Sequence, residues 1–161
     1  MIVIVMGVTG SGKTTVGKLL ADELGWRFVD GDSFHPPANV EKMRRGVPLT
    51  DSDRRPWLAE LRGQIQEWVA QQRNVVLACS ALKKDYRQEL ETGPKVRFIY
   101  LKGTSELIGE RLRVRHGHFA GTQILAGQFA DLEEPTDAVT VDISATPDQI
   151  VAEARQKLGL A

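Results

Sequence analysis

The feature that most constrains this chain is a glycine-rich loop that directly follows an apolar segment. Residues 7–14 have the sequence Gly-Val-Thr-Gly-Ser-Gly-Lys-Thr, which matches the phosphate-binding pattern G-x-x-x-x-G-K-[ST] at every fixed position. Residues 1–6 are apolar throughout, as expected of a central parallel strand that helices cover on both faces. An amphipathic helical pattern follows the loop and ends at Gly25. A strand, loop and helix in this order predict a fold that binds a nucleoside triphosphate.

Length and composition limit the number of domains and the kinds of partner. A chain of 161 residues, 42% of them hydrophobic and 26% charged, has the composition of one globular domain. Its 21 basic and 21 acidic residues give no formal net charge, which argues against a nucleic-acid partner, because DNA-binding domains are usually basic. The single cysteine excludes an internal disulfide, and no apolar run approaches the roughly 20 residues of a membrane helix. We therefore expect a cytoplasmic protein without a membrane partner, and leave open whether it is a homodimer.

Strands and helices alternate along the rest of the chain. Apolar strands are expected at residues 27–30, 75–79, 96–101 and 139–143. Helical patterns are expected at residues 36–43, 55–72 (capped by Ser52 or Asp53), 82–90, 106–115, 125–132 and after Thr146. This order predicts an α/β three-layer sandwich with a five-stranded, mainly parallel sheet, which is a P-loop NTPase fold with a helical lid. We expect residues 1–161 to form one domain, in which residues 33–72 bind the acceptor and residues 111–132 form the lid.

The loop residues have specific expected roles in binding phosphate. Glycines allow successive backbone N–H groups to point at an anion, and the helix N-terminus adds partial positive charge. Lys13 is expected to reach the β- and γ-phosphates, and the Thr14 hydroxyl to bind Mg²⁺. Thr15 lies one position further, where its hydroxyl also fits an ordinary residue of the first helical turn. The expected ATP-binding loop residues are Gly7, Val8, Thr9, Gly10, Ser11, Gly12, Lys13, Thr14 and Thr15.

The motifs that the sequence lacks, and the length of the chain, exclude several classes of nucleotide-binding enzyme. No Asn-Lys-x-Asp guanine motif occurs, and the Asp-x-x-Gly sequence at residues 22–25 ends the first helix instead of following a strand. Both observations argue against a GTPase switch protein. Motor and transporter ATPases are much larger than this chain. With extra helices between the second and third strands, the strongest class is a small-molecule kinase.

Two aspartates follow the second strand, where a bound acceptor is expected. Ligands of open α/β sheets bind beyond the carboxyl ends of the strands, and Asp30 and Asp32 lie at such an end. One carboxylate could orient the water shell of the metal while the other accepts the proton of an attacking hydroxyl. Alternatively, one of them only caps the helix at residues 36–43. The third strand ends without the carboxylate of many P-loop enzymes, so we assign Asp30 to Mg²⁺ through water and Asp32 as the base, with exchanged roles left open.

Several further blocks resemble one family of small-molecule kinases. They are DGDSFHP at residues 30–36 followed by Asn39 and EKM at 41–43, GVPLTDSDRRPWL at 46–58, CSALKK at 79–84 with Tyr86-Arg87, FIYLKG at 98–103 and GHF at 117–119. In this order they are similar to the gluconate kinases of the shikimate kinase and nucleoside monophosphate kinase superfamily. The blocks extend over most of the chain, and their combination is more specific than the P-loop alone. The resemblance implies ATP-dependent phosphorylation of D-gluconate to 6-phospho-D-gluconate, a reaction of carbohydrate metabolism.

Such an acceptor needs a fixed cation for its carboxylate and polar groups for its hydroxyls. Outside the loop, the candidate cations are Arg54, Lys83 and Arg87. Arg54 is preferred because a planar guanidinium suits a carboxylate and because this residue opens a helix, whose N–H groups also favour an anion. The alternative for Arg54 is a surface ion pair with a neighbouring aspartate. His35 is expected to bind a sugar hydroxyl, or else to be a structural histidine.

Two arginines belong to the expected lid. Arg111 and Arg115 are four residues apart and project from one face of their helix, whereas Arg113 projects from another. In kinases of the resembled superfamily, arginines at this place stack on adenine and reach the transferred phosphate. The expected catalytic residues are therefore Lys13, Asp32 and Arg115.

Two other functions stay open at this point. A shikimate-type kinase shares the layout but has a different set of motifs beyond the P-loop. A nucleotide-binding module without catalysis would need neither the aspartate pair nor the lid arginines. Phosphorylation of a small sugar acid, with ATP as donor and Mg²⁺ as metal, is the preferred interpretation.

Overall fold

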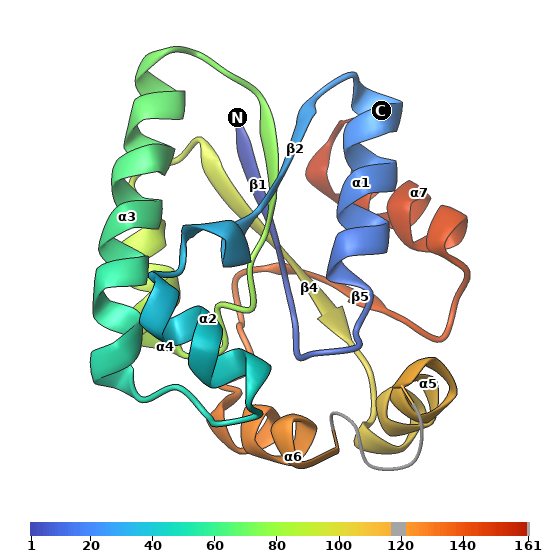
Figure 1. The fold of residues 1–161 in the computed structure, drawn as a ribbon. Helices are drawn as coiled ribbons and strands as arrows, with labels where there is room; N and C mark the ends of the chain where they lie inside the picture. Colours follow the sequence, from blue (N-terminus) through green and yellow to red (C-terminus); the bar gives the residue numbers. More distant parts are fainter. Residues whose placement is uncertain (117–121, 161) are drawn as a thin grey trace.

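A five-stranded parallel sheet forms the centre of the molecule. The computed structural model describes residues 1–116 and 122–160, apart from the side chains of residues 115, 116, 122 and 123 (Figure 1). The strands lie in the order β2-β3-β1-β4-β5, and each neighbouring pair is parallel. Their bounds are β1 Ile2–Met6, β2 Arg27–Asp30, β3 Val75–Ala78, β4 Val96–Lys102 and β5 Val139–Asp142. The predicted sheet is confirmed, with the strand before the P-loop at its centre.

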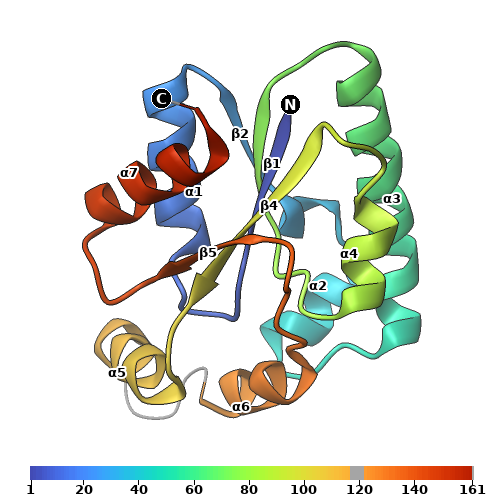
Figure 2. The same ribbon diagram turned by 180° about the vertical axis from the view of Figure 1, so that it is seen from behind.

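Helices cover both faces of the sheet and one of its ends. On one face lie α1 (Lys13–Leu24) and α7 (Pro147–Leu158), and on the other lie α3 (Asp51–Ala70) and α4 (Lys84–Leu90) (Figures 1 and 2). Near the carboxyl ends of the strands lie the 3₁₀ turn η1 (Gly31–Phe34), α2 (Pro37–Arg44), α5 (Ser105–His116) and α6 (Thr122–Asp131). The three-layer α/β sandwich is therefore confirmed, and both chain termini lie at the end opposite α5 and α6.

The sheet separates two apolar cores. Successive strand side chains point to opposite faces, so Val3 and Val5 of β1 pack under α1 and α7, whereas Ile2 and Ile4 pack under α3. All four are fully buried because helices cover both faces. None of the described helices is long and apolar enough to cross a membrane.

The predicted starts of α3 and α4 are wrong. α3 begins at Asp51 and its cap is Thr50, not Ser52 or Asp53. The Thr50 hydroxyl accepts from the Asp53 N–H while the Asp53 carboxylate accepts from the Thr50 N–H, so Asp53 is the inner member of a capping box. α4 begins only after Lys83, whose extended backbone keeps the buried Leu82 outside the helix. Of the predicted lid, residues 117–121 lie outside the described residues.

Two glycines shape the end of the sheet where the pockets form. Gly12 caps α1 with a φ of 97°, a left-handed conformation that glycine adopts without strain. Gly31 lies between the two aspartates after β2, and a Cβ atom there would approach the carbonyl oxygen of Ala78 to 2.8 Å. Glycine therefore allows the two aspartates to lie directly against the end of β3.

Candidate active site

The P-loop lines a polar pocket of about 190 Å³. Its walls are the loop, the first turn of α1, and the ends of β2 and β3. The Lys13 Nζ atom donates to the carbonyl oxygens of Gly7 (3.0 Å) and Val8 (3.1 Å). Burial lowers the pKa of Lys13, and the nearby Asp32 carboxylate is the main opposing influence. We call this cavity the phosphate pocket, because it combines the predicted anion-binding loop with a held lysine.

Asp30 and Asp32 both line the phosphate pocket but differ in their surroundings. The Asp30 carboxylate accepts from the backbone N–H of Asp32 (3.0 Å) and so caps η1. α2 begins after Pro36, which excludes the alternative in which an aspartate caps that helix. The Asp32 side chain stays 66% exposed at the pocket. Desolvation by the surrounding protein is the main cause that raises the pKa of Asp32, and the negative charge of Asp30 adds to it. The positive charge of Lys13 opposes this shift. An accessible carboxylate with a raised pKa has the properties of a general base.

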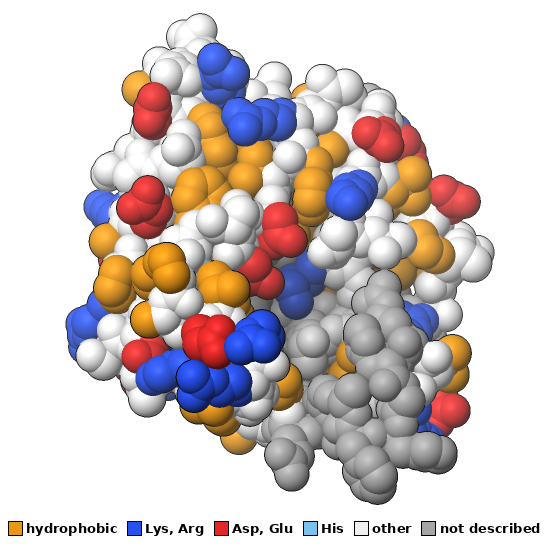
Figure 3. All heavy atoms as spheres, viewed as in Figure 1, with side chains coloured by type: hydrophobic (Ala, Val, Ile, Leu, Met, Phe, Trp, Pro, Cys, Tyr) orange, Lys and Arg blue, Asp and Glu red, His pale blue; other side chains and the backbone are white. Residues whose placement is uncertain are grey.

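A second cavity, of about 290 Å³, adjoins the phosphate pocket at Thr9, Lys13 and Asp32, which line both. We call it the acceptor pocket. The chain after α2 forms an apolar wall, His35 and Arg54 contribute polar groups, and α6 closes another side. Acidic and basic side chains meet in a hollow near the middle of the face shown in Figure 3. Two pockets that share a lysine and a carboxylate can hold a phosphate donor next to a hydroxyl acceptor.

Arg54 lines the acceptor pocket with its side chain 17% exposed. Its Nη1 atom donates to the Tyr86 hydroxyl (3.1 Å), and its Nη2 atom lies 3.8 Å from a carboxylate oxygen of Asp131 on α6. It pairs with neither Asp51 nor Asp53, so the alternative of a surface ion pair with these neighbours is wrong. This predicted cation and the predicted base, Asp32, therefore line the same pocket.

The other two candidate cations lie outside the lining of the acceptor pocket. Lys83 forms an ion pair (2.9 Å) with the first residue of α3. Arg87 is 7% exposed and donates at 2.6–3.0 Å to the backbone carbonyls of Ala81, Leu82 and Glu133. These bonds occupy its guanidinium and fasten the chain before α4 to the segment after α6. The assignment of Arg87 to substrate binding is therefore corrected to a structural role.

His35 follows η1, lines the acceptor pocket and has a side chain that is 4% exposed. Its ring stacks on Trp57, with 4.3 Å between the ring centroids and 13° between the planes. The Trp57 Nε1–H donates to the carbonyl oxygen of Gly31 (2.8 Å). Burial, and then the Arg54 charge, lower the pKa of His35 to about 4, so the ring is neutral at neutral pH. Sequence analysis missed Trp57 as a pocket residue, because its helical spacing indicated only a core position.

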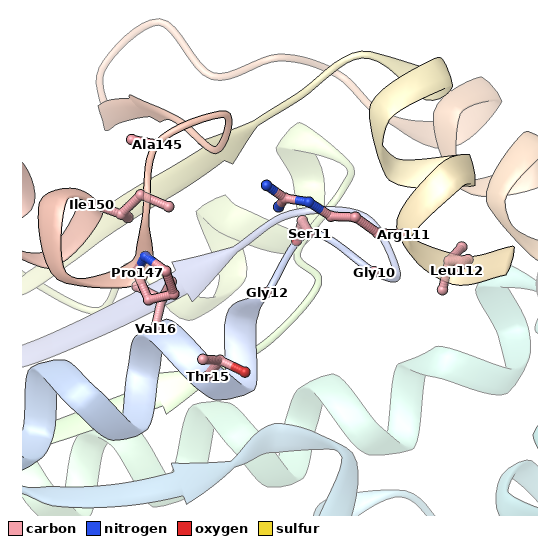
Figure 4. Close-up of a pocket in the computed structure, with 10 residues that line it drawn as sticks. All are labelled: Gly10, Ser11, Gly12, Thr15, Val16, Arg111, Leu112, Ala145, Pro147 and Ile150. Atoms are coloured by element: carbon pink, nitrogen blue, oxygen red, sulfur yellow. The ribbon is translucent and has the colours of Figure 1, made fainter. Parts of the chain in front are cut away.

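A third cavity, of about 260 Å³, lies on the other side of the P-loop (Figure 4). Arg111 extends from α5 over the loop at Ser11, and its Nη2 atom donates to the carbonyl oxygen of Ile143 (2.6 Å). Ala145, from the turn between β5 and α7, and Pro147, the first residue of α7, form the opposite wall. The apolar walls and the arginine suit a flat nucleotide base attached to phosphates in the adjoining loop.

α6 supplies two polar contacts that sequence analysis missed. The Gln128 side-chain oxygen accepts from the backbone N–H of Thr9 in the P-loop, and Asp131 faces Arg54. Gln128 and Asp131 are three positions apart, so they share a helical face. This spacing, beside the apolar stripe of α6, was the signal in the sequence that could have indicated the two contacts. Of the expected lid arginines, Arg115 belongs to α5, but its side chain lies outside the described residues.

The residues of the phosphate pocket fit a magnesium ion that keeps most of its water. Thr14 and Asp30 line the pocket together and supply a hydroxyl and a carboxylate oxygen, the ligand type that Mg²⁺ prefers. β3 ends in Ala78 and Cys79 without a carboxylate, and the described residues hold no group of three or more His, Cys, Asp or Glu side chains that could bind a metal. Few protein ligands are ordinary for Mg²⁺ bound with substrate phosphates.

Known proteins resemble this chain over nearly its whole length. Residues 9–158 match the family model described as shikimate kinase. The chain is 44% identical to the gluconokinase of Gluconobacter oxydans (strain 621H), over 93% of this chain and 86% of the relative. It is 45% identical to the thermoresistant gluconokinase of Escherichia coli (strain K12), over 94% and 89% of the two chains. The crystal structure of a gluconokinase from Sinorhizobium meliloti 1021 superimposes with a TM-score of 0.88 at 40% identity, covering 98% and 90% of the two chains.

Proposed function

The chain belongs to the gluconokinase family, and we propose that its two adjoining pockets transfer the γ-phosphoryl group of ATP to the terminal hydroxyl of D-gluconate. The product is 6-phospho-D-gluconate. The observation that best supports this reaction is that Lys13 and Asp32 line both the phosphate pocket and the acceptor pocket. The proposal includes a cytoplasmic location, in line with the cysteine usage of the sequence.

Each charged group has one role in the transfer. Asp32 accepts the proton of the attacking hydroxyl, and its raised pKa makes it a stronger base than an ordinary carboxylate. Lys13 leaves the loop carbonyls and neutralises charge on the phosphate oxygens. Mg²⁺, when bound at Thr14 and through water at Asp30, neutralises further phosphate charge. Arg54 fixes the gluconate carboxylate and thereby orients the far end of the acceptor.

Steady-state assays with three acceptors test this function. We expect kcat/KM for gluconate to exceed that for shikimate or a nucleoside monophosphate by roughly 10²-fold or more. The wrong acceptor would leave polar groups of the pocket without hydrogen-bond partners. Efficient turnover of shikimate without gluconate would make the chain a shikimate-type kinase. ATP binding without transfer to any of the three would indicate a nucleotide-binding module.

The carboxylate clamp predicts strong selection against uncharged relatives of gluconate. Sorbitol offers a similar primary hydroxyl but has no carboxylate, so the largely buried Arg54 guanidinium would keep only the Asp131 carboxylate, 3.8 Å away, as an anionic partner. We expect kcat/KM for gluconate to exceed that for sorbitol by roughly 10²-fold, measured with the same enzyme preparation and saturating ATP. Comparable values for the two acceptors would contradict both the clamp and the choice of a sugar acid.

The variant Arg54→Met separates the clamp from other cations. This variant should lose most of the preference for gluconate over sorbitol, because gluconate binds more weakly, and the KM for ATP should change little. The matched control is Lys83→Met, since Lys83 is a nearby cation that the acceptor-pocket lining does not include. If the preference survives in Arg54→Met and is lost in Lys83→Met, the clamp is Lys83.

The lid arginines give a separate prediction. Because Arg115 follows Arg111 by four residues in the sequence, we propose that Arg115→Ala lowers kcat about tenfold or more while changing the KM for gluconate little, since its expected partner charge develops on the transferred group. Arg113→Ala is the control, since Arg113 pairs with Glu110 on the exposed side of α5. An equal loss of kcat in Arg115→Ala and Arg113→Ala would contradict a specific role of Arg115 and would indicate only a general effect of removing positive charge.

A further inference from the structure

We propose that Asn39 is a positioning residue that holds the His35 imidazole in its Nε2–H form, so that His35 offers a fixed hydrogen-bond donor to a gluconate hydroxyl beside Asp32. The inference rests on the proposed function for the identity of the acceptor. The hydrogen bonds that determine the ring form are independent of any bound molecule. Neither the P-loop nor the carboxylate clamp assigns a role to Asn39, which is a polar residue only 3% exposed.

The first step is the orientation of the Asn39 side-chain amide. One end of this amide lies 2.8 Å from the backbone carbonyl oxygen of Asp53, in the first turn of α3. A carbonyl oxygen only accepts hydrogen bonds, so the amide must present its NH₂ group there. The reverse orientation would bring two oxygen atoms together inside a buried contact, where an unmade hydrogen bond is costly. The Asp53 carbonyl in the first turn of α3 therefore fixes which way the Asn39 amide points.

The second step is the position of the proton on His35. The same Asn39 nitrogen lies 3.2 Å from the His35 Nδ1 atom, so its second hydrogen is available to that ring nitrogen. Nδ1 must then be the acceptor and carry no proton. A neutral imidazole carries one N–H group, so the proton is on Nε2. The low pKa of His35 agrees with a neutral ring at neutral pH.

The third step is the direction of the Nε2–H group. Stacking on Trp57 fixes the plane of the ring, and the Nε2 atom lies 3.9 Å from an Asp32 carboxylate oxygen. That separation is too long for a direct hydrogen bond. An acceptor oxygen bound near both groups can therefore take a hydrogen bond from His35 while a hydroxyl proton faces Asp32. In this form His35 donates and cannot remove a proton, which leaves Asp32 as the base.

Nitrogen NMR of the full-length protein reads the ring form directly. With ¹⁵N-labelled histidine and without ligands, we expect His35 to show a protonated Nε2 and an unprotonated Nδ1 at neutral pH, the signals being assigned by their loss in His35→Gln. Asn39→Asp replaces the donor by a group that only accepts, so it should draw the proton to Nδ1. We expect kcat/KM for gluconate to fall about tenfold in Asn39→Asp, with the KM for ATP unchanged. An unchanged proton position in Asn39→Asp would overturn the role of Asn39.

Two substitutions of His35 itself keep the test decisive if Asn39→Asp fails to fold. A glutamine amide nitrogen reaches the place of Nε2, whereas an asparagine amide nitrogen reaches only that of Nδ1. We expect His35→Gln to retain about tenfold more kcat/KM for gluconate than His35→Asn, because only the former restores the donor. Equal losses would overturn the donor role. If the parent protein shows the expected ring form but phosphorylates an acceptor other than gluconate, the proposed function fails while the role of Asn39 stands.

Discussion

Replacing Lys13 by alanine is expected to lower kcat for gluconate phosphorylation by roughly 10³-fold or more while the protein stays folded. The Nζ atom donates only to two loop carbonyls in the described structure, and we expect both hydrogen bonds to be released when phosphate binds. Its charge is thus available for the phosphate oxygens, where no neighbouring residue of the phosphate pocket can replace it. Single-turnover phosphoryl transfer and the ligand-free melting temperature measure the two parts of this prediction.

The control for Lys13 lies on the same helix. Lys18 is exposed on α1, with its Nζ 5.8 Å from the Phe28 ring and outside every described pocket lining. Lys18→Ala should therefore leave kcat within about twofold of the parent, as usual for a surface site. A large fall in the ligand-free melting temperature of Lys13→Ala would show that Lys13 has a structural role instead.

Replacing Asp32 by asparagine is expected to lower kcat by about 10³-fold, within the usual range for the loss of a general base, with ATP binding retained. The base is active when ionised, so activity falls as the pH drops through its pKa. Because the surrounding protein and Asp30 raise that pKa in the ligand-free enzyme, the acid limb of the kcat/KM profile should lie above the ordinary range of an aspartate. The limb should disappear from the residual activity of Asp32→Asn, as a pH–rate series would show.

Asp30→Asn is the matched comparison for this role. Asparagine also accepts the backbone N–H of Asp32 and so preserves the cap of η1. We expect a smaller loss of kcat than in Asp32→Asn, accompanied by a higher Mg²⁺ requirement, because our proposal assigns Asp30 to Mg²⁺ through water. A near-neutral Asp32→Asn together with a severe Asp30→Asn would exchange the two roles.

The lysine and the aspartates were predictable because local rules apply to them. A P-loop binds phosphate through backbone groups that the glycine spacing dictates, and the residue after a parallel strand lies at the edge where ligands bind. The positions of Lys13, Asp30 and Asp32 in one pocket follow from these two rules and from the parallel sheet. The helix starts were less certain, because Thr50, Ser52 and Asp53 are all good caps and only the capping box selects one.

The sequence by itself determined the nucleotide-binding half of the site, whereas the tertiary structure decided which side chains meet the acceptor. Arg54 and Arg87 look alike as cations in the sequence, yet Arg54 lines the pocket while Arg87 bonds to a carbonyl 46 residues away. Likewise, Asn39 joins His35 to α3 only because packing brings α2 against the start of α3. The physical reason is that a long or polar side chain takes its role from the partners that desolvate and bind it, and those partners come from distant segments.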